Sequence, residues 1–203
     1  MTAISDSHAV TDVQRVALKI FLENGSVVKP RAIVPIFHRW IQTQAVDGLL
    51  IDVADYTHVP AGPSVLLVAH EGHYALDRTD NEPGLLYART QPLEGAPAER
   101  WTRIARMLMH AARLLEQDTT LEDAVRFRSN EIKFIANDRL LAPNDAITLA
   151  ALRPDLESFL GVLSDGDGWD LSPDTDPAAR FTVRAITPKT TPIETLSTRL
   201  QSV

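Results

Sequence analysis

The residue types best suited to chemistry gather in one stretch of the sequence, residues 48–77. It reads GLLIDVADYTHVPAGPSVLLVAHEGHYALD, and two apolar runs, 49–53 and 65–69, flank a Pro-Ala-Gly-Pro turn. A lone carboxylate buried among apolar residues is costly, so a polar group kept in such a run indicates a cleft or a paired structural site. The polar side chains along the two runs are Asp52, Asp55, Tyr56, His58, His70, Glu71 and His73.

Metal binding is one chemistry that these residues could support. His58, His70 and His73, with nearby carboxylates, supply the nitrogen and oxygen ligands that zinc, iron or manganese take in proteins. The metalloprotease pattern H-E-x-x-H, however, needs one more residue than the spacing between His70 and His73 provides. The H-x-H start of a cupin is also absent from this stretch. Histidines that line a cleft form hydrogen bonds more often than they bind metals, so a divalent metal is one alternative among three.

Acid–base catalysis without a metal is the second alternative. His70 titrates near neutral pH and Asp52 or Glu71 could orient it, while Tyr56 and Tyr74 are expected to contact the ligand. Neighbouring residues of a strand point to opposite faces, so the orienting carboxylate must come from another strand. No serine in the stretch has the G-x-S-x-G context of an activated nucleophile. The third alternative is that these polar groups are structural.

The sequence pattern predicts that these residues are positioned by an α+β fold. This fold is a mainly antiparallel sheet with helices packed on one face. The predicted order is strand, helix, three-stranded meander, long helix, hairpin, broken helix, strand and short helix. The hairpin turns at Ser129-Asn130, and Pro154 interrupts the broken helix. Strands are expected at residues 13–22, 49–53, 65–69, 84–90, 125–128, 131–136 and 180–186. Helices are expected at residues 29–44, 96–116 and 144–161, and from residue 191 onward.

Several helix details follow from single residues. Two starts are expected for the first helix. Pro30 suits a first helical position, and a start near Val34 is the alternative, because Pro35 fits poorly inside a helix. Asn144 is expected to cap the broken helix, and Thr191 with Glu194 to form a capping box for the last one. The long helix has the clearest apolar stripe, which should pack on the sheet. A line of basic residues on its other face is expected to be solvated: Arg103, Arg106, His110 and Arg113.

Composition restricts the class of protein. The chain has 203 residues, a formal net charge of −7 and no cysteine, so disulfides and thiolate sites are excluded. An acidic chain without a basic tract is a poor nucleic-acid ligand, and no apolar run approaches the length that spans a membrane. The first residues lack the pattern of a signal peptide. We therefore expect a cytoplasmic protein with neither nucleic acid nor membrane as a partner.

One domain is expected over residues 1–203, because no linker-like stretch divides the sequence. Residues 1–11 are expected to be disordered, and residues 164–177 to form an acidic loop. The loop lacks the central glycine of a calcium-binding EF-hand, so it is expected to be solvated. Residues 19–24, KIFLEN, resemble residues 133–138, KFIAND, but six residues are too few to establish a duplication, and chance explains the likeness.

Two classes of function remain. The first is a small binding or interaction protein, which the lack of a complete catalytic signature favours. It is expected to be a homodimer, because three tryptophans and the apolar strand 84–90 could leave a surface or sheet edge to pair. The alternative is a small hydrolase or isomerase, with or without a metal, that uses the polar residues of 48–77.

Overall fold

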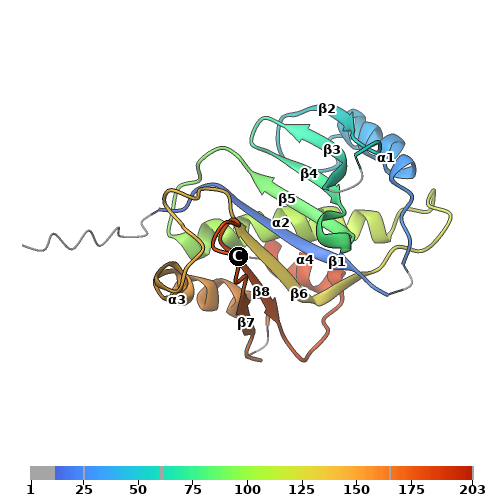
Figure 1. Cartoon of the computed structure of the whole chain (residues 1–203). Helices are drawn as coiled ribbons and strands as arrows, with labels where there is room; N and C mark the ends of the chain where they lie inside the picture. The colour runs from blue at the N-terminus through green and yellow to red at the C-terminus, as the bar shows by residue number, and fades with distance from the viewer. Residues whose placement is uncertain (1–11, 25, 60–61, 165, 203) are drawn as a thin grey trace, which may run out of the picture.

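The computed structural model describes residues 12–24, 26–59, 62–164 and 166–202, so the expected disorder of residues 1–11 lies outside the described part. It confirms the α+β class, because four helices pack against one eight-stranded antiparallel sheet (Figure 1). Among the described residues, no helix combines the length and the apolar character needed to cross a membrane.

The strands lie in the order β2-β3-β4-β5-β1-β6-β8-β7, and each pairs antiparallel with its neighbours. The central pair is therefore β5 and β1, and the edges are β2 and β7. The strand bounds are β1 Val16–Leu22, β2 Leu50–Asp55, β3 Pro63–Ala69, β4 Gly72–Asp77, β5 Gly84–Arg89, β6 Phe127–Ala136, β7 Asp170–Pro173 and β8 Thr182–Ile186.

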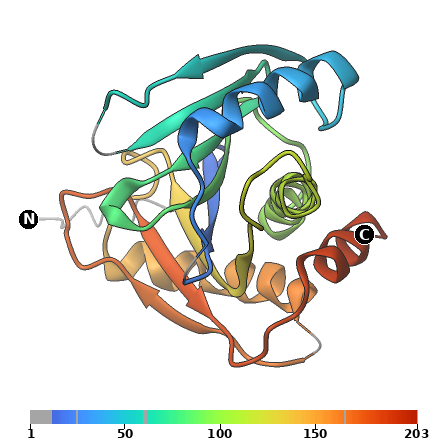
Figure 2. The ribbon, with the colours of Figure 1, turned by 90° about the vertical axis from the view of Figure 1, so that its right-hand side faces the viewer.

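The helices cover one face of the sheet, which curves around α2 (Figure 2). Their bounds are α1 Pro30–Thr43, α2 Pro97–Glu116, α3 Ala146–Leu163 and α4 Ile193–Gln201, and a short turn, η1 Thr79–Asn81, links β4 to β5. The apolar stripe of α2 is buried as expected, with Trp101, Ile104 and Leu108 almost without exposure. The other face of the sheet, which the helices leave uncovered, is called the open face below.

Two strand predictions were wrong. The meander has a fourth strand, because the chain turns at His70-Glu71 and β4 returns beside β3. The expected hairpin at residues 125–136 is instead the single strand β6. Its Ser129-Asn130 pair does not turn, because the register against β1 shifts at this point and the Asn130 amide donates to the Thr187 carbonyl at 3.3 Å. The polar residues that resembled a turn therefore form a bulge within β6.

The helix predictions also need correction. Helix α1 begins at Pro30, which confirms the first of the two expected starts, and it contains Pro35. Helix α3 continues through Pro154, where an interruption was expected. The carbonyl that Pro154 leaves unpaired belongs to Ala150, which is exposed, so water can hydrate it. Asp145, rather than Asn144, caps α3 by accepting a 2.8 Å hydrogen bond from Thr148 N–H. The capping box expected for α4 is absent, and the expected acidic loop contains strand β7.

The reasons given for a homodimer do not hold in the structure. The strand expected to leave an edge is β5, which lies inside the sheet between β4 and β1. Trp40 and Trp101 are buried in the core, and Trp169 is half-buried, with its indole N–H donating to Leu160 O at 3.0 Å. Strand β1 is buried along its whole length because it is one of the two central strands of the sheet.

The strands from the first half of the chain, β1 to β5, and those from the second half, β6 to β8, meet at the β1–β6 pair and share several features. Lys19 and Lys133, which begin the two similar hexapeptides, are direct cross-strand partners. In each half the last strand lies beside the first, β5 beside β1 and β8 beside β6. The hydrogen bonds that close each half also match, with Leu22 N–H donating to Pro83 O and Ala136 N–H donating to Phe181 O, both at 2.9 Å. The likeness that we attributed to chance therefore has a structural counterpart.

Candidate functional site

The residues singled out in the sequence separate in space. Asp52 and His70 are exposed, one on the edge strand β2 and the other in the turn after β3. Tyr56 and His58 are exposed beyond the end of β2, with their ring centroids 6.2 Å apart. Tyr74 is fully buried between Trp40 and Tyr87, and burial raises the pKa of its phenol. The part of the chain that the structure describes contains no group of three His, Asp or Glu side chains placed to hold a metal.

Glu71 has a structural partner. Its Oε2 accepts a 2.9 Å hydrogen bond from Leu49 N–H, and this bond lowers the pKa of the Glu71 carboxyl. The preceding Gly48 has φ +113°, and a Cβ there would lie 2.9 Å from the same oxygen. Glu71 thus fixes the entry of the chain into β2.

His73 is the predicted site residue that lines a cavity. This cavity lies on the open face and has a volume of about 620 Å³. Its floor is one row of cross-strand partners, called the floor row: His73 of β4, Ala88 of β5, Ala17 of β1, Ile135 of β6 and Thr182 of β8. The hollow exists because two central positions of this row carry only a methyl group.

Three cations form the next row on the open face. Lys19, Lys133 and Arg184 are successive cross-strand partners on β1, β6 and β8. Like charges that face one another across strands destabilise a sheet, so this cation row requires compensation.

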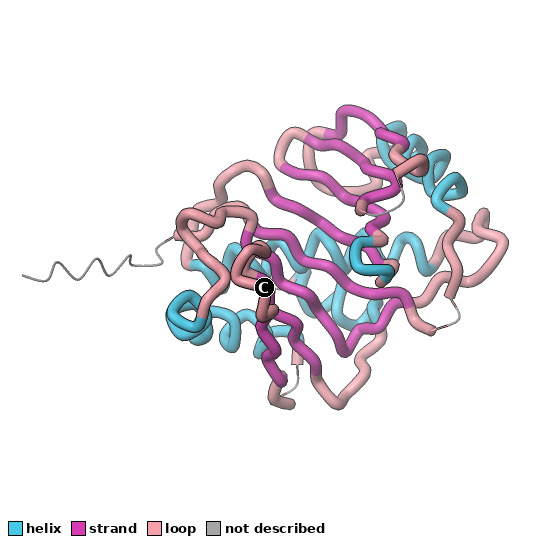
Figure 3. The backbone as a smooth tube through the Cα atoms, in the orientation of Figure 1, coloured by secondary structure: helices cyan, strands magenta, loops and turns pink. Residues whose placement is uncertain are grey.

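The chain between β4 and β5 supplies that compensation. We call residues 77–82 the strap, and its η1 turn lies in front of the sheet in Figures 1 and 3. Each of its three carboxylates pairs with one cation of the row, and these pairs are Asp77 with Lys19, Asp80 with Lys133, and Glu82 with Arg184. The strap is thereby fixed across the open face and forms one wall of the cavity.

The ion pairs between the strap and the cation row differ in how easily the cation can change its partner. Lys19 and Asp77 are both buried, their side chains 2% and 6% exposed, with 2.5 Å between Nζ and Oδ2. Burial lowers the pKa of Lys19, and the hydrogen bond that Lys19 Nζ donates to Asp77 Oδ2 opposes that shift. Asp80, in contrast, is 61% exposed and lies 3.0 Å from Lys133 Nζ. Solvent screens this pair at its exposed Asp80 end, although the Lys133 side chain is only 16% exposed, so Lys133 can change partner at a smaller cost than Lys19.

The opposite wall is the connection from β7 to β8, residues 174–180. Its position is set from within the protein, because Asn144 Nδ2 donates to the carbonyls of Asp174 and Asp176 at 3.2 and 2.7 Å. Arg180 lines the cavity and donates to Asn137 Oδ1 at 2.7 Å. Both walls are therefore anchored by side chains distant in sequence.

Burial favours the neutral form of His73. It is half-buried, and burial lowers the pKa of its imidazole. A neutral imidazole can donate a hydrogen bond from one ring nitrogen and accept one at the other. The cavity thus combines an apolar floor, the His73 imidazole at one end of the floor row, and the Lys133 ammonium in the neighbouring cation row.

Comparison with known proteins adds no assignment. The chain matches no protein-family model, no curated protein and no solved structure. The function must therefore be inferred from the geometry described above.

Proposed function

We propose that this protein binds a small organic anion, a flat apolar molecule with a carboxylate, in the cavity on the open face. The floor row carries this proposal, because Ala88, Ala17 and Ile135 offer an apolar surface with space above it. Ligand sites in proteins combine such apolar surface with a few placed polar groups. Lys133 and His73 supply those groups, and Lys133 becomes available when the exposed Asp80 turns to solvent.

A binding role accounts for these residues more simply than catalysis does. The expected catalytic residues Asp52 and His70 lie outside the cavity lining. The alternative, a small hydrolase or isomerase, is favoured only by His73, because a neutral half-buried imidazole can act as a general base. Turnover of a bound carboxylate that His73→Gln abolishes, with binding retained, would favour the enzyme.

Filling the floor of the cavity should abolish binding. Ala17→Leu places three more carbon atoms over the floor row, where the wild-type methyl group lines the cavity. Saturation-transfer NMR with a panel of aryl carboxylates should show binding to the wild type and at least about a tenfold weaker affinity for the variant. Ala151→Leu, the same change at an exposed position of α3, is the control and should bind like the wild type. Equal binding by Ala17→Leu would contradict the proposed site.

A homodimer is the second part of the proposal, and the edge strand β2 supports it. Its unpaired backbone groups could extend the sheet with the same strand of a second copy. Three exposed apolar side chains lie along or beside this edge, namely Leu49, Ile51 and Tyr56 at 64%, 58% and 44% exposure. The expected cytoplasmic location and the single domain over residues 1–203 stay predictions.

The dimer prediction is tested by solution mass. Light scattering at micromolar concentration should give about twice the 22.4 kDa chain mass for the wild type. Ile51→Lys should return the monomer mass, because it places a charge on the proposed contact. Ile147→Lys introduces the same charge at an exposed position of α3, 73% accessible, and should leave the dimer intact. A wild-type mass of 22.4 kDa would refute self-association under these conditions.

A further inference from the structure

A second cavity lies where α2, α3 and α4 meet. Its volume is about 340 Å³, and its apolar wall consists of Ala98 of α2, Val162 of α3 and Leu200 of α4. Small side chains leave this space open, because Ala98 and Thr102 lie one turn apart on α2 and Ser158 lines the cavity from α3. None of its lining residues belongs to the cavity on the open face.

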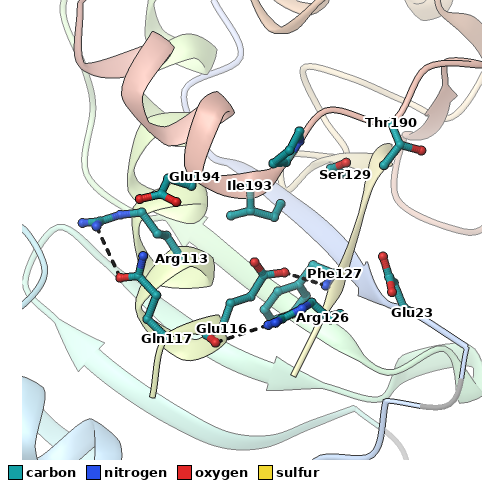
Figure 4. Close-up of a pocket in the computed structure, with 11 residues that line it drawn as sticks. Glu23, Arg113, Glu116, Gln117, Arg126, Phe127, Ser129, Thr190, Ile193 and Glu194 are labelled. Atoms are coloured by element: carbon teal, nitrogen blue, oxygen red, sulfur yellow. Dashed lines mark hydrogen bonds between the residues drawn. The ribbon is translucent and has the colours of Figure 1, made fainter. Parts of the chain in front are cut away.

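The line of basic residues along α2 is only partly solvated. Arg103 is exposed as expected, whereas Arg106, His110 and Arg113 are half-buried. The two residues at the C-terminal end of the line contact each other, with 3.3 Å between Arg113 Nη2 and His110 Nδ1. Arg113 also donates to Gln117 Oε1 at 3.4 Å, in a different hollow beside the end of α2 (Figure 4). The line thus divides, and its other two members, Arg103 and Arg106, line the second cavity.

These two arginines have donors to spare. Among the described residues, the guanidinium of Arg106 forms neither a hydrogen bond nor an ion pair, although its side chain is half-buried at the cavity. Arg103 donates to the carbonyl of Glu94 at 3.3 Å and forms no ion pair within the same part of the chain. A guanidinium has five N–H donors and no acceptor, so most of the donors at this cavity remain available to an anion.

The one carboxylate among the described lining residues is engaged elsewhere. Glu99 Oε2 accepts a 3.2 Å hydrogen bond from Ala96 N–H at the start of α2. Gly95 has φ +104°, and a Cβ there would lie 2.6 Å from the same oxygen, so the chain fits closely around this carboxylate. Glu99 forms no ion pair with Arg103 or Arg106, both of which the structure describes. The lining therefore has a net positive charge, in a chain whose formal net charge is −7.

We propose that this second cavity binds a small organic phosphate, a phosphomonoester that carries an apolar group. Arg103 and Arg106 are three residues apart on α2, so their side chains lie on the same side of the helix. Guanidinium groups match phosphate oxygens with paired N–H donors, and two cations balance the dianion that a phosphomonoester forms above its second pKa of about 6. The apolar group lies on Val162 and Leu200, and the cavity has the size of a site for one small molecule. This inference is independent of the cavity on the open face.

The probe for this inference is phenyl phosphate, measured by isothermal titration calorimetry on the full chain at slightly alkaline pH and two temperatures. The wild type should bind it, and phenyl sulfate, which has the same shape but a single negative charge, should bind at least about tenfold more weakly. Inorganic phosphate should also bind more weakly, because it lacks the ring that contacts Val162 and Leu200. Lowering the pH below about 6 should weaken the binding of phenyl phosphate, because the ligand then takes up a proton.

Three variants locate the site. Arg106→Gln should weaken the affinity for phenyl phosphate by at least about tenfold, because it removes one of the two charges. Arg31→Gln is the matched control, since it removes the same charge at an exposed position of α1 that does not line the cavity, and it should bind like the wild type. Ser158→Trp fills the cavity from α3 without a change of charge and should abolish binding.

Several results would overturn the proposal. Equal weakening by Arg106→Gln and Arg31→Gln would reflect only general attraction between the anion and the cations of the chain. Wild-type affinity in Ser158→Trp, equal affinity for phenyl phosphate and phenyl sulfate, or no heat with phenyl phosphate at either temperature would also contradict it. Ala17→Leu should leave the binding of phenyl phosphate unchanged, and a loss in that variant would assign the phosphate to the open-face cavity instead.

Discussion

Replacing Asp77 by Asn should lower the free energy of unfolding by about 3–5 kcal/mol at neutral pH. The substitution keeps the shape of the side chain but leaves the Lys19 ammonium, 2% exposed, without its counter-ion. A buried charge without a partner is far more costly than the intact pair is favourable. Denaturant unfolding monitored by tryptophan fluorescence measures the loss.

Two controls identify the buried charge as the cause. Lys19→Met/Asp77→Asn removes both charges and should recover most of the lost stability, because an apolar chain replaces the ammonium. The single variant should also regain stability as the pH rises toward the ordinary lysine pKa of 10.5. Its folded-state pKa for Lys19 lies below the unfolded one, so the unfolded chain binds more protons in that range and stability increases with pH. A single variant as stable as the wild type would show that the pair does not fix the strap.

Leu108→Ala should lower the free energy of unfolding by about 2–5 kcal/mol, the usual cost of a large-to-small change in a core. Leu108 has no exposure and lies in the middle of α2, around which the sheet curves. Thermal or denaturant unfolding measures the effect. Arg103→Ala, on the exposed face of the same helix, is the control and should stay within about 0.5 kcal/mol of the wild type. A loss that small for Leu108→Ala would mean that α2 is not the centre of the core.

The fold class and α2 could be predicted because they depend on local patterns. The apolar stripe of α2 repeats over 20 residues, so its helical period is clear from the sequence alone. The pairing of β2 with β3 was also correct, since two apolar runs flank a short Pro-Gly link. Each of these signals lies within a short stretch of the chain, so the local residue pattern is enough to identify it.

The missed elements depend on tertiary context instead. Ser129-Asn130 resembles a turn, yet β6 continues because β1 accepts a bulge there. Pro154 resembles a helix breaker, yet α3 continues because the freed carbonyl lies on an exposed side. In both cases a neighbouring strand or the solvent decides the outcome, and neither is visible in the local sequence.

The candidate site was only partly accessible from the sequence. The stretch 48–77 contains His73 and Asp77, but their neighbours Lys19 and Lys133 lie more than 50 residues away along the chain. One signal could have connected them, namely the likeness between residues 19–24 and 133–138. Taken as a structural relation, it pairs Lys19 with Lys133 and identifies β1 and β6 as neighbouring strands.

The most direct test of the binding proposal is methyl NMR of the protein labelled at alanine and isoleucine. Titration with the tightest-binding aryl carboxylate should shift the methyl signals of Ala17, Ala88 and Ile135 first, because these side chains form the floor row. The methyl signals of Ile33 and Ala112, buried on the helical side, should move little. Shifts confined to the helical side, or no shift with any aryl carboxylate, would contradict a ligand site on the open face.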